Sequence, residues 1–349
     1  MPLSSLPITP QQMMSGGMQN KQILIDSLPQ GKLTAKNFRC EDSEVPAIGE
    51  EEVLIKTTAL IISAGTRAGL QGSASYAGAP EAGRVMNGTG VGEVVKSNCD
   101  NIPLGSRVTA STGWQQYSAH QGGAVEVIPP DHDPVRYLGA LGISGLTAYF
   151  GLLEVAAPKP GETVLVSAAA GSVGHLVGQL ARIHGARAVG VCGSDTKAKV
   201  LVQKLGFDAA VNYKSEDFRE ALKSATPDGV DVYFDNTGGM ILGSALFRMN
   251  KGGRIACCGV VSQYDTDKPE PSPKGIPGLL VNKRLNMQGF LVLDYANRYT
   301  EARQQLLTWL ESGELQFLTD EVYGLEAAPK AFVDLLSGGN LGSRVVRLN

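Results

Sequence analysis

The pattern of hydrophobic and polar positions along the chain changes near Val135. Before this point, stretches rich in β-branched residues alternate with turn residues, as in Val53–Ile62, Gly88–Val95 and Ser106–Ser111. This spacing predicts a β-rich unit that begins near Lys21. Beyond the change, short apolar runs alternate with segments of helical period, which is the signature of βαβ units and a parallel sheet. The pattern therefore predicts two units of different architecture.

Three segments in the second part of the chain carry apolar residues at the i, i+3, i+4, i+7 spacing of an amphipathic helix. They follow predicted strands at Thr163–Ser167, Ala188–Cys192 and Val230–Asp235. Further strands are predicted at Arg254–Gly259 and Leu285–Val292, which completes a doubly wound sheet. The three helical stripes are Val173, Leu176, Val177 and Leu180; Ala198, Leu201, Val202 and Leu205; and Leu242, Ala245, Leu246 and Met249.

The two ends of the chain differ in character. Near the C-terminus, the apolar spacing of Ala328, Ala331, Phe332 and Leu335 predicts a helix, and the run SRVVRLN after it predicts a closing strand. The chain is therefore expected to return to the first unit. Residues 1–18 begin with neither a basic segment nor a continuous apolar run, so they are interpreted as a disordered leader and not as a secretory signal.

Composition narrows the class of protein. The chain has 349 residues and a net charge of −3, with 43% hydrophobic and 19% charged residues. These values argue against a disordered chain or a basic nucleic-acid binder. The longest uncharged stretch, Tyr137–Leu153, is interrupted by glycines, so no membrane span is expected. The five cysteines lack paired C-x-x-C spacing, which indicates reduced thiols in a cytoplasmic protein and no structural zinc site.

Glycine is in excess, with 43 of 349 residues, and part of this excess lies in one turn. The segment TVLVSAAAGSVGHLVGQLA is a predicted strand, a small-residue turn and a helix, with Ala169, Gly171 and Gly174 in the places of a G-x-G-x-x-G motif and Ser172 and Val173 between them. Small residues let the backbone approach a pyrophosphate, and the helix N-terminus supplies N–H donors. Sheet-to-helix packing would also favour them. With a second βα unit following, the segment predicts a dinucleotide site.

The next strand end bears on which dinucleotide binds. Asp195 lies about 20 residues beyond Gly174, a spacing at which an acid can bind the ribose 2′-hydroxyl of NAD. Ser194 precedes this acid, and Lys197 and Lys199 follow it, as expected where a 2′-phosphate is accommodated. The lysines could equally form an exposed helix face. These residues favour NADP and leave NAD open.

Several motifs together resemble a known family. The runs AAAGSVG, GSDTK, LGFD, NYK, FDNTGG, CCGVVSQY, LNMQGF and GGNLG occur in the order found in the medium-chain dehydrogenase/reductase superfamily. The chain is most similar to its zinc-independent NADPH-dependent alkenal/one reductases, the prostaglandin reductase and curcumin reductase group. The resemblance implies a GroES-like β-rich catalytic domain from residues 19–134 and 306–349, around a Rossmann domain at 135–305. It also implies NADPH as the cofactor and a homodimer.

The resemblance assigns further cofactor contacts. Lys197 of the G-S-D-x-K turn and Tyr213 of N-Y-K correspond to residues that contact the 2′-phosphate. Asn236 of F-D-N-x-G-G and Asn340 of G-x-N-L-G correspond to cofactor contacts, and Gly259 lies at a strand end that approaches the cofactor. The alternative for the two asparagines is that they occupy left-handed backbone in turns.

No metal is expected at the catalytic centre. Zinc-dependent relatives carry an early cysteine and a G-H-E motif, but the matching stretch Met86–Val94 has neither histidine nor cysteine. The histidines share no short spacing and are interpreted as structural or surface groups. They are His120, His132, His175 and His184.

Without a metal Lewis acid, reduction of a conjugated double bond is the favoured reaction. Hydride transfer to the β-carbon of an α,β-unsaturated ketone or aldehyde spreads charge onto the carbonyl oxygen, where one or two donors can stabilise the enolate. By resemblance, Tyr264 of C-G-x-x-S-x-Y is such a donor together with a cofactor ribose hydroxyl, and solvent protonates the α-carbon. Tyr264 could instead pack or stack on the cofactor. The alternatives for the protein are a quinone oxidoreductase and a non-catalytic NADPH-binding protein.

One segment departs from the family pattern. Many members carry D-P-Y-M-R where this chain reads ISAGTRAGL, which keeps Arg67 but lacks the tyrosine. The substrate is therefore left unassigned, although Thr66 offers a hydroxyl. The Pro- and Gly-rich loop Ser262–Gly278 is expected to cover the nicotinamide end, and Tyr76 to face the same cleft.

Overall fold

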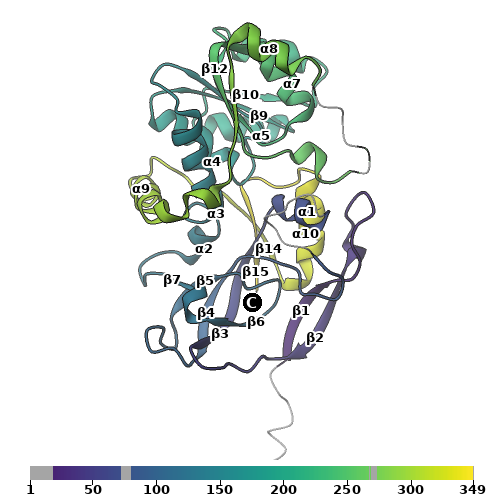
Figure 1. The fold of residues 1–349 in the computed structure, drawn as a ribbon, viewed down its shortest axis with the longest axis vertical. Coiled ribbons are helices and arrows are strands. Elements are labelled where there is room, and N and C mark those ends of the chain that lie inside the picture. Colours follow the sequence, from purple (N-terminus) through teal and green to yellow (C-terminus); the bar gives the residue numbers. More distant parts are fainter. Residues whose placement is uncertain (1–18, 72–79, 267, 269–272, 349) are drawn as a thin grey trace, which may run out of the picture.

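The computed structural model describes residues 19–71, 80–266, 268 and 273–348. Figure 1 shows two sheet-based parts along the long axis of the molecule, with the N-terminal strands in the lower part and the middle of the chain in the upper part. The C-terminal segment, in yellow, runs back from the upper part into the lower one. The predicted leader at residues 1–18 and Tyr76 lie outside the described residues.

The upper part is built on a six-stranded sheet in the order β10-β9-β8-β11-β12-β13. Every neighbouring pair is parallel, and the order is that of a Rossmann fold, with the first strand in the middle. The predicted doubly wound α/β fold is confirmed. The strands are β8 (Thr163–Val166), β9 (Arg187–Cys192), β10 (Ala209–Asn212), β11 (Val230–Asp235), β12 (Met249–Cys257) and β13 (Asn286–Gly289).

Helices cover both faces of this sheet because its strands are apolar on both sides. In β8, Val164 and Val166 pack in a cluster with Leu180 of α4, whereas Leu165 packs in a different cluster with Leu246 of α7. Successive strand residues point to opposite faces, which explains this division. The helices are α4 (Gly174–Ile183), α5 (Asp195–Gln203), α6 (Phe218–Ala225), α7 (Gly239–Arg248) and α8 (Ile276–Lys283).

The lower part contains a seven-stranded sheet and a two-stranded hairpin. The larger sheet runs β14-β15-β3-β4-β5-β7, with β6 paired to β3, and the hairpin joins β1 and β2. Strands from both ends of the chain share the larger sheet, since β15 pairs antiparallel with β3 and sets Val346 opposite Leu60. The strands are β1 (Gln19–Ile25), β2 (Phe38–Glu44), β3 (Glu52–Ile62), β4 (Gly90–Ser97), β5 (Arg107–Ala110), β6 (Tyr117–Gln121), β7 (Glu126–Val127), β14 (Thr319–Tyr323) and β15 (Ser343–Arg347).

The C-terminal segment also packs into the lower core. Helix α9 (Tyr299–Ser312) leads out of the upper part, and helix α10 (Ala328–Leu336) follows β14. Phe332 of α10 lies with its ring centroid 5.8 Å from Trp114 and 6.4 Å from Phe38, and all three side chains are buried. Aromatic burial of this extent stabilises the return of the chain.

The glycine-rich stretch between the two parts forms helices. It contains α2 (Pro134–Leu138), α3 (Ile143–Tyr149) and a π-helical continuation at Phe150–Ala156. A side chain at Gly145 would collide with the Ala140 carbonyl, and one at Gly151 would collide with the Phe290 ring. Close packing therefore accounts for these glycines. Within the described residues, no helix is long and apolar enough to cross a membrane.

Candidate active site

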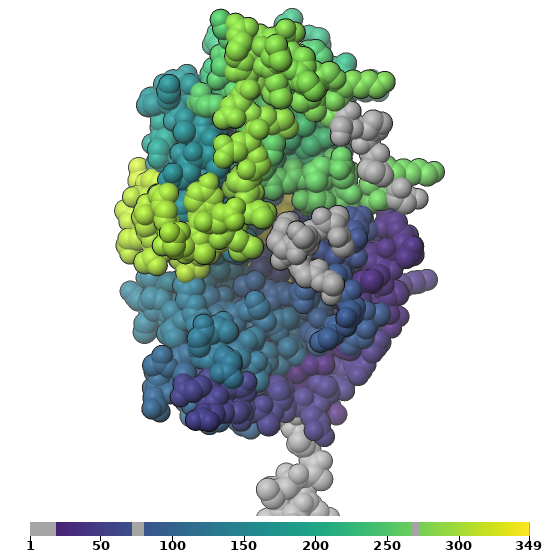
Figure 2. Space-filling model, in the orientation of Figure 1, coloured from purple at the N-terminus to yellow at the C-terminus, as the bar shows by residue number. Residues whose placement is uncertain are grey.

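A cleft of about 1470 Å³ lies between the two parts of the molecule. In the space-filling view, the purple and blue surface of the lower part meets the teal and green surface of the upper part across the middle of the molecule (Figure 2). The upper wall comes from the carboxyl ends of β8, β9 and β11, and the lower wall from the end of β3, helix α1 (Gly65–Leu70) and α10. A typical small-ligand pocket holds roughly 300–1,000 Å³, so this cleft has room for a dinucleotide and a second molecule.

Most of the predicted cofactor residues meet in this cleft although they come from distant parts of the sequence. The exceptions are Ala169 and Ser194. Ala169 is fully buried and its N–H donates to Val191 on β9, so it packs the turn onto the sheet. The predicted residues that line the cleft are Gly171, Ser172, Val173, Gly174, Lys197, Tyr213, Asn236, Gly259, Tyr264 and Asn340.

The turn between β8 and α4 is tight for a steric reason. Ala168 adopts left-handed backbone with φ of 46°, and its carbonyl accepts from the Gly171 N–H at 2.9 Å. A side chain at Gly174 would collide with that carbonyl and lie 2.8 Å from the Ala169 Cα atom. The first turn of α4 therefore sits directly behind the loop, and its N–H groups give a positive partial charge that favours an anion.

His175 supports this turn from behind. The side chain is fully buried, its Nε2 accepts from the Leu318 N–H at 3.2 Å, and its Nδ1 lies 2.8 Å from the Gly171 carbonyl oxygen. These partners define a neutral ring with the proton on Nδ1, which donates to Gly171. Burial lowers the pKa of His175 to about 4, which keeps the ring neutral near pH 7.

A cationic edge lies where β9 and β10 end. The Lys197 Nζ donates to the Gly338 carbonyl at 2.7 Å, so this lysine spans from α5 to the loop after α10. Burial is the main cause that lowers the pKa of Lys197, and the neighbouring Lys214 adds to it. The Lys214 Nζ lies 5.8 Å from the Tyr213 ring centroid, and both side chains line the cleft. This edge can hold a phosphate.

Asp195, the acid that could have bound the ribose 2′-hydroxyl of NAD, does not face the cleft. The Asp195 carboxylate accepts from the Asn212 side-chain amide at 3.1 Å, and Asp195 is absent from the residues that line the cleft. Ser194 caps α5, because its hydroxyl accepts from the Lys197 backbone N–H at 3.3 Å. The geometry thus favours a 2′-phosphate over a bare 2′-hydroxyl at this edge.

The two predicted asparagines hold backbone segments at the cleft. The Asn236 amide donates to the Ser167 carbonyl at 2.7 Å and joins the ends of β8 and β11. The Asn340 amide donates to the Gly342 carbonyl at 2.8 Å. Neither residue has positive φ, so the alternative of left-handed turn asparagines is wrong. Asn236 therefore brings two strand ends together at the cleft, whereas Asn340 fixes the loop that leads into β15.

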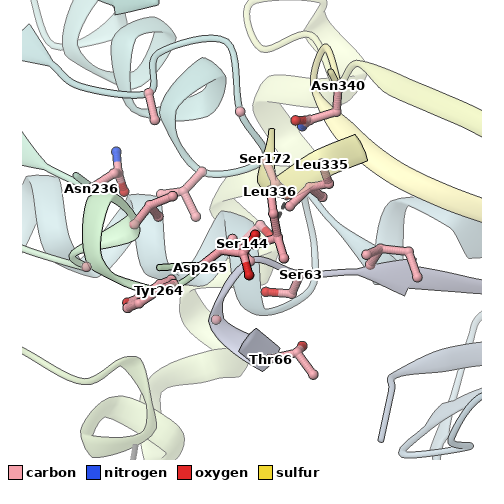
Figure 3. A pocket seen from close by; sticks show the side chains of 18 of the residues that line it. Ser63, Thr66, Ser144, Ser172, Asn236, Tyr264, Asp265, Leu335, Leu336 and Asn340 are labelled. Carbon is pink, nitrogen blue, oxygen red and sulfur yellow. Dashed lines mark hydrogen bonds between the residues drawn. The ribbon is translucent and has the colours of Figure 1, made fainter. Parts of the chain in front are cut away.

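Tyr264 lies on the loop after β12, which is two strands away from β8 and the phosphate turn in the same sheet. Its hydroxyl accepts from the Val260 N–H at 3.3 Å, and it would lie 3.2 Å from a side chain at Gly259, so the glycine leaves room for the tyrosine. Figure 3 shows Tyr264 on this loop, with Ser63 and Thr66 on the segment from the lower part. The predicted covering loop Ser262–Gly278 reaches the cleft in its first part, where Ser262, Tyr264 and Asp265 line it. Its last residues do not line the cleft and begin α8; residues 267 and 269–272 lie outside the described residues.

Sequence reasoning missed several residues of the cleft. Ser144 of α3 lines it, and its hydroxyl lies 2.7 Å from that of Ser172, which lies 2.5 Å from the Ser343 hydroxyl. Asp265 and Lys214 directly follow predicted residues and were within reach of the motif analysis. The apolar lining has no local signal, because it combines distant segments: Ile62, Leu70, Met86, Phe290, Leu335 and Leu336.

Two other kinds of group bear on the chemistry of the cleft, namely side chains that could bind a metal ion and a cysteine thiol in the lining. Among the described residues, no group of three or more His, Cys, Asp or Glu side chains could hold a metal ion. Cys258 lines the cleft, but burial raises its pKa to about 12. A thiol with this pKa stays protonated and is a poor nucleophile.

Comparison with known proteins gives consistent matches. Residues 172–312 match the zinc-binding dehydrogenase family model, and residues 21–128 match the N-terminal domain of oxidoreductase. The chain is 36% identical to the NADPH-dependent curcumin reductase of Escherichia coli (strain K12), over 95% of this chain and 97% of that protein. It is 38% identical to the 2-alkenal reductase (NADP(+)-dependent) of Nicotiana tabacum, over 96% and 99%.

A solved structure agrees with these matches. The structure of CurA in complex with NADPH from Vibrio vulnificus superposes with a TM-score of 0.90, at 36% identity over 94% of this chain and 99% of that one. Fold, motif order and full-length similarity thus point the same way. The chain belongs to the medium-chain dehydrogenase/reductase superfamily, in its alkenal/one reductase group.

Proposed function

We propose that this protein is an NADPH-dependent oxidoreductase that reduces the carbon–carbon double bond of α,β-unsaturated ketones and aldehydes. The observation that carries the proposal is that one cleft has a phosphate-binding turn and a cationic edge at one end and Tyr264 beside an apolar lining at the other. The similarity to curcumin reductase and 2-alkenal reductase supports the same reaction.

The residues of the cleft fit NADPH. The α4 N-terminus behind Gly171–Gly174 suits the pyrophosphate, because the bare Gly174 lets the first turn of α4 pack directly against Ala168 and Ala169 and present its N–H groups there. Lys197, Lys214 and Tyr213 suit the 2′-phosphate, and Asn236 and Asn340 hold the backbone on either side. When bound, NADPH supplies a hydride for the β-carbon of the substrate. We also propose that residues 19–134 and 306–349 form the catalytic domain and that residues 135–305 form the Rossmann domain that binds the cofactor.

Tyr264 is proposed to stabilise the enolate. The Val260 N–H donates to its hydroxyl oxygen, which polarises the O–H group and strengthens it as a donor. A substrate carbonyl oxygen at this hydroxyl would receive a hydrogen bond as negative charge develops on it. The apolar residues around Ile62, Phe290 and Leu336 would hold the remainder of the substrate and exclude water from the reacting face. Solvent would then protonate the α-carbon.

The test is a survey of acceptors with the purified protein. We expect oxidation of NADPH with small enones and enals, at a rate that a metal chelator leaves unchanged. A preference for quinones over every enone would replace the proposal with a quinone oxidoreductase. Tight NADPH binding without turnover of any acceptor would instead favour a non-catalytic NADPH-binding protein.

We further propose that two copies associate through the upper sheet and that the protein is cytoplasmic. Strand β13 is an edge of the six-stranded sheet, and Val281 of the neighbouring α8 is 72% exposed. An open edge beside an apolar side chain favours pairing with a second copy. Light scattering should give the dimer mass, and a Gln288→Pro variant should give the monomer.

The cytoplasmic location is supported by the cysteines. All five are free thiols, as expected in a reducing compartment. Cell fractionation tests this location.

A further inference from the structure

The loop that carries Tyr264 is attached at its first end to the upper part of the molecule. The Val261 N–H donates to the Asn236 carbonyl at 3.2 Å, and the Ser262 hydroxyl donates to the Thr237 carbonyl at 2.6 Å. Asn236 and Thr237 follow β11. This end of the loop therefore moves with the Rossmann sheet.

The second end of the loop is attached to the lower part. One oxygen of the Asp265 carboxylate, Oδ1, accepts from the Leu33 N–H at 2.6 Å and from the Arg67 Nε at 2.9 Å. The Arg67 Nη2 also donates to the Gly31 carbonyl at 2.5 Å. Figure 3 shows Asp265 next to Tyr264 at the cleft. The residue after the tyrosine thus joins the loop to two separate segments of the lower part.

Loss of the Arg67–Asp265 ion pair would cost more free energy than loss of a surface ion pair, because the pair is largely buried. The Arg67 side chain is 0% exposed and that of Asp265 is 18% exposed. Loss of the carboxylate would leave a buried guanidinium without its counter-charge, a larger penalty than the loss of a surface pair. A charge-assisted bond at 2.9 Å also fixes direction well. Asp265 is therefore held firmly, and Tyr264 lies between two anchors that belong to different parts.

We propose that Asp265 and Arg67 form a latch that sets the position of the Tyr264 hydroxyl in the cleft. In this role, which rests on the enone reductase function proposed above, Asp265 is a positioning residue and acts through Tyr264. The two ends of the Tyr264 loop are attached to different parts of the molecule. The position of Tyr264 therefore depends on how the upper and lower parts are placed relative to each other. A displacement of about 1 Å at a reacting group can cost up to roughly a hundredfold in rate, so such fixation matters.

The latch itself is tested by amide hydrogen exchange on the full-length protein. In an Asp265→Ala variant, we expect exchange at the backbone amides of Leu33 and Tyr264 to rise by about tenfold, with β8 unchanged. The matched control is Glu126→Ala, which removes another arginine–carboxylate pair between distant segments, Arg303 to Glu126 at 2.5 Å, outside the cleft lining. Unchanged exchange at both amides in Asp265→Ala would overturn the latch, whatever the activity.

The positioning role is tested by a double-mutant cycle with Tyr264→Phe. Asp265→Ala should lower kcat about tenfold while the Kd for NADPH stays within about twofold. In the Tyr264→Phe background, the same change should cost less than about twofold, since the group that it positions is gone. An Asp265→Asn variant keeps an acceptor for Leu33 and should recover part of the loss.

The outcomes separate the two proposals. A second tenfold loss from Asp265→Ala in the Tyr264→Phe background would overturn the positioning role. An unmodified protein that reduces no enone would overturn the proposed function, while the exchange measurement still decides whether the latch exists.

Discussion

The two ends of the cleft are built in different ways. At the adenosine end, Gly171 and Gly174 lie at the β8–α4 turn and Lys197 lies on α5, so consecutive elements of the Rossmann sheet set their backbone positions, although the Lys197 Nζ also donates to the Gly338 carbonyl. At the tyrosine end, Tyr264 depends on Asp265, which binds Arg67 from a segment 198 positions earlier in the chain. The backbone of the first end is set by neighbouring elements of one sheet, with support from C-terminal residues such as Leu318, whereas the second end forms only when both parts of the molecule meet.

This difference assigns different tasks to the two ends. A turn between a neighbouring strand and helix can present the same backbone N–H groups to a cofactor wherever that motif recurs. A site assembled from distant segments can change its substrate by changing one of them, and Ser63 and Thr66 line the cleft from such a segment of the lower part. Substitutions at the first end should therefore change cofactor affinity, and substitutions at the second should change turnover.

The largest effect on cofactor binding is expected from Gly174→Ala at the adenosine end. A Cβ atom there would collide with the Ala168 carbonyl, so the turn must open, and we expect affinity for NADPH to fall by about 100-fold, or about 2.7 kcal/mol. Fluorescence titration measures this. Gly123→Ala is the control, since nothing lies within 4 Å of a Cβ atom at that position. Equal affinity in the two variants would contradict a sterically closed turn.

The support behind the same turn should depend on pH. The unfolded chain protonates His175 as the pH falls through 6.5, but the folded protein does so only near a pKa of about 4. The unfolded state therefore binds more protons in this window, and the free energy of unfolding should decrease by about 3 kcal/mol as the pH falls across it. Urea unfolding at several pH values measures the slope. A His175→Gln variant should lose this part of the slope, and an unchanged slope would contradict the burial of a neutral ring.

A smaller and selective effect is expected at the cationic edge. Lys197→Ala should weaken NADPH binding by about 30-fold, or about 2 kcal/mol, because a charged hydrogen bond to the 2′-phosphate is lost. Affinity for NADH, which lacks this phosphate, should stay within about twofold. The control is Lys199→Ala on the exposed face of the same helix. An equal loss of affinity for NADPH and NADH would show that Lys197 does not bind the 2′-phosphate.

The smallest effect concerns the tyrosine end and should appear in turnover alone. Tyr264→Phe should lower kcat for an enone about tenfold, less than for a donor to a localised oxyanion, because conjugation spreads the charge. The Kd for NADPH should not change. Tyr323→Phe serves as the control, as this tyrosine is 64% exposed on β14. Full activity in Tyr264→Phe would remove its role as a donor.

The difference between the two ends of the cleft also explains which features can be predicted from the sequence. The Rossmann strands, the phosphate turn and Lys197 follow from period and motif, because local residues define them. Strand β10 and helix α6 went unpredicted, since only four residues form the strand and only Phe218 and Leu222 of the helix are buried. The Asp265–Arg67 pair and the apolar lining carry no local pattern, because they arise when distant segments pack. Asn236 and Asn340 were placed correctly at the cleft, but their backbone-holding bonds require coordinates.

In the proposed reaction, a hydride passes from NADPH to the β-carbon of an enone bound in the same cleft. The decisive experiment uses NADPH deuterated at C4 on the transferred face, a small α,β-unsaturated ketone and analysis of the product by NMR. We expect a saturated ketone with deuterium on the β-carbon and a solvent-derived hydrogen on the α-carbon. Deuterium on the carbonyl carbon of an alcohol product would contradict it.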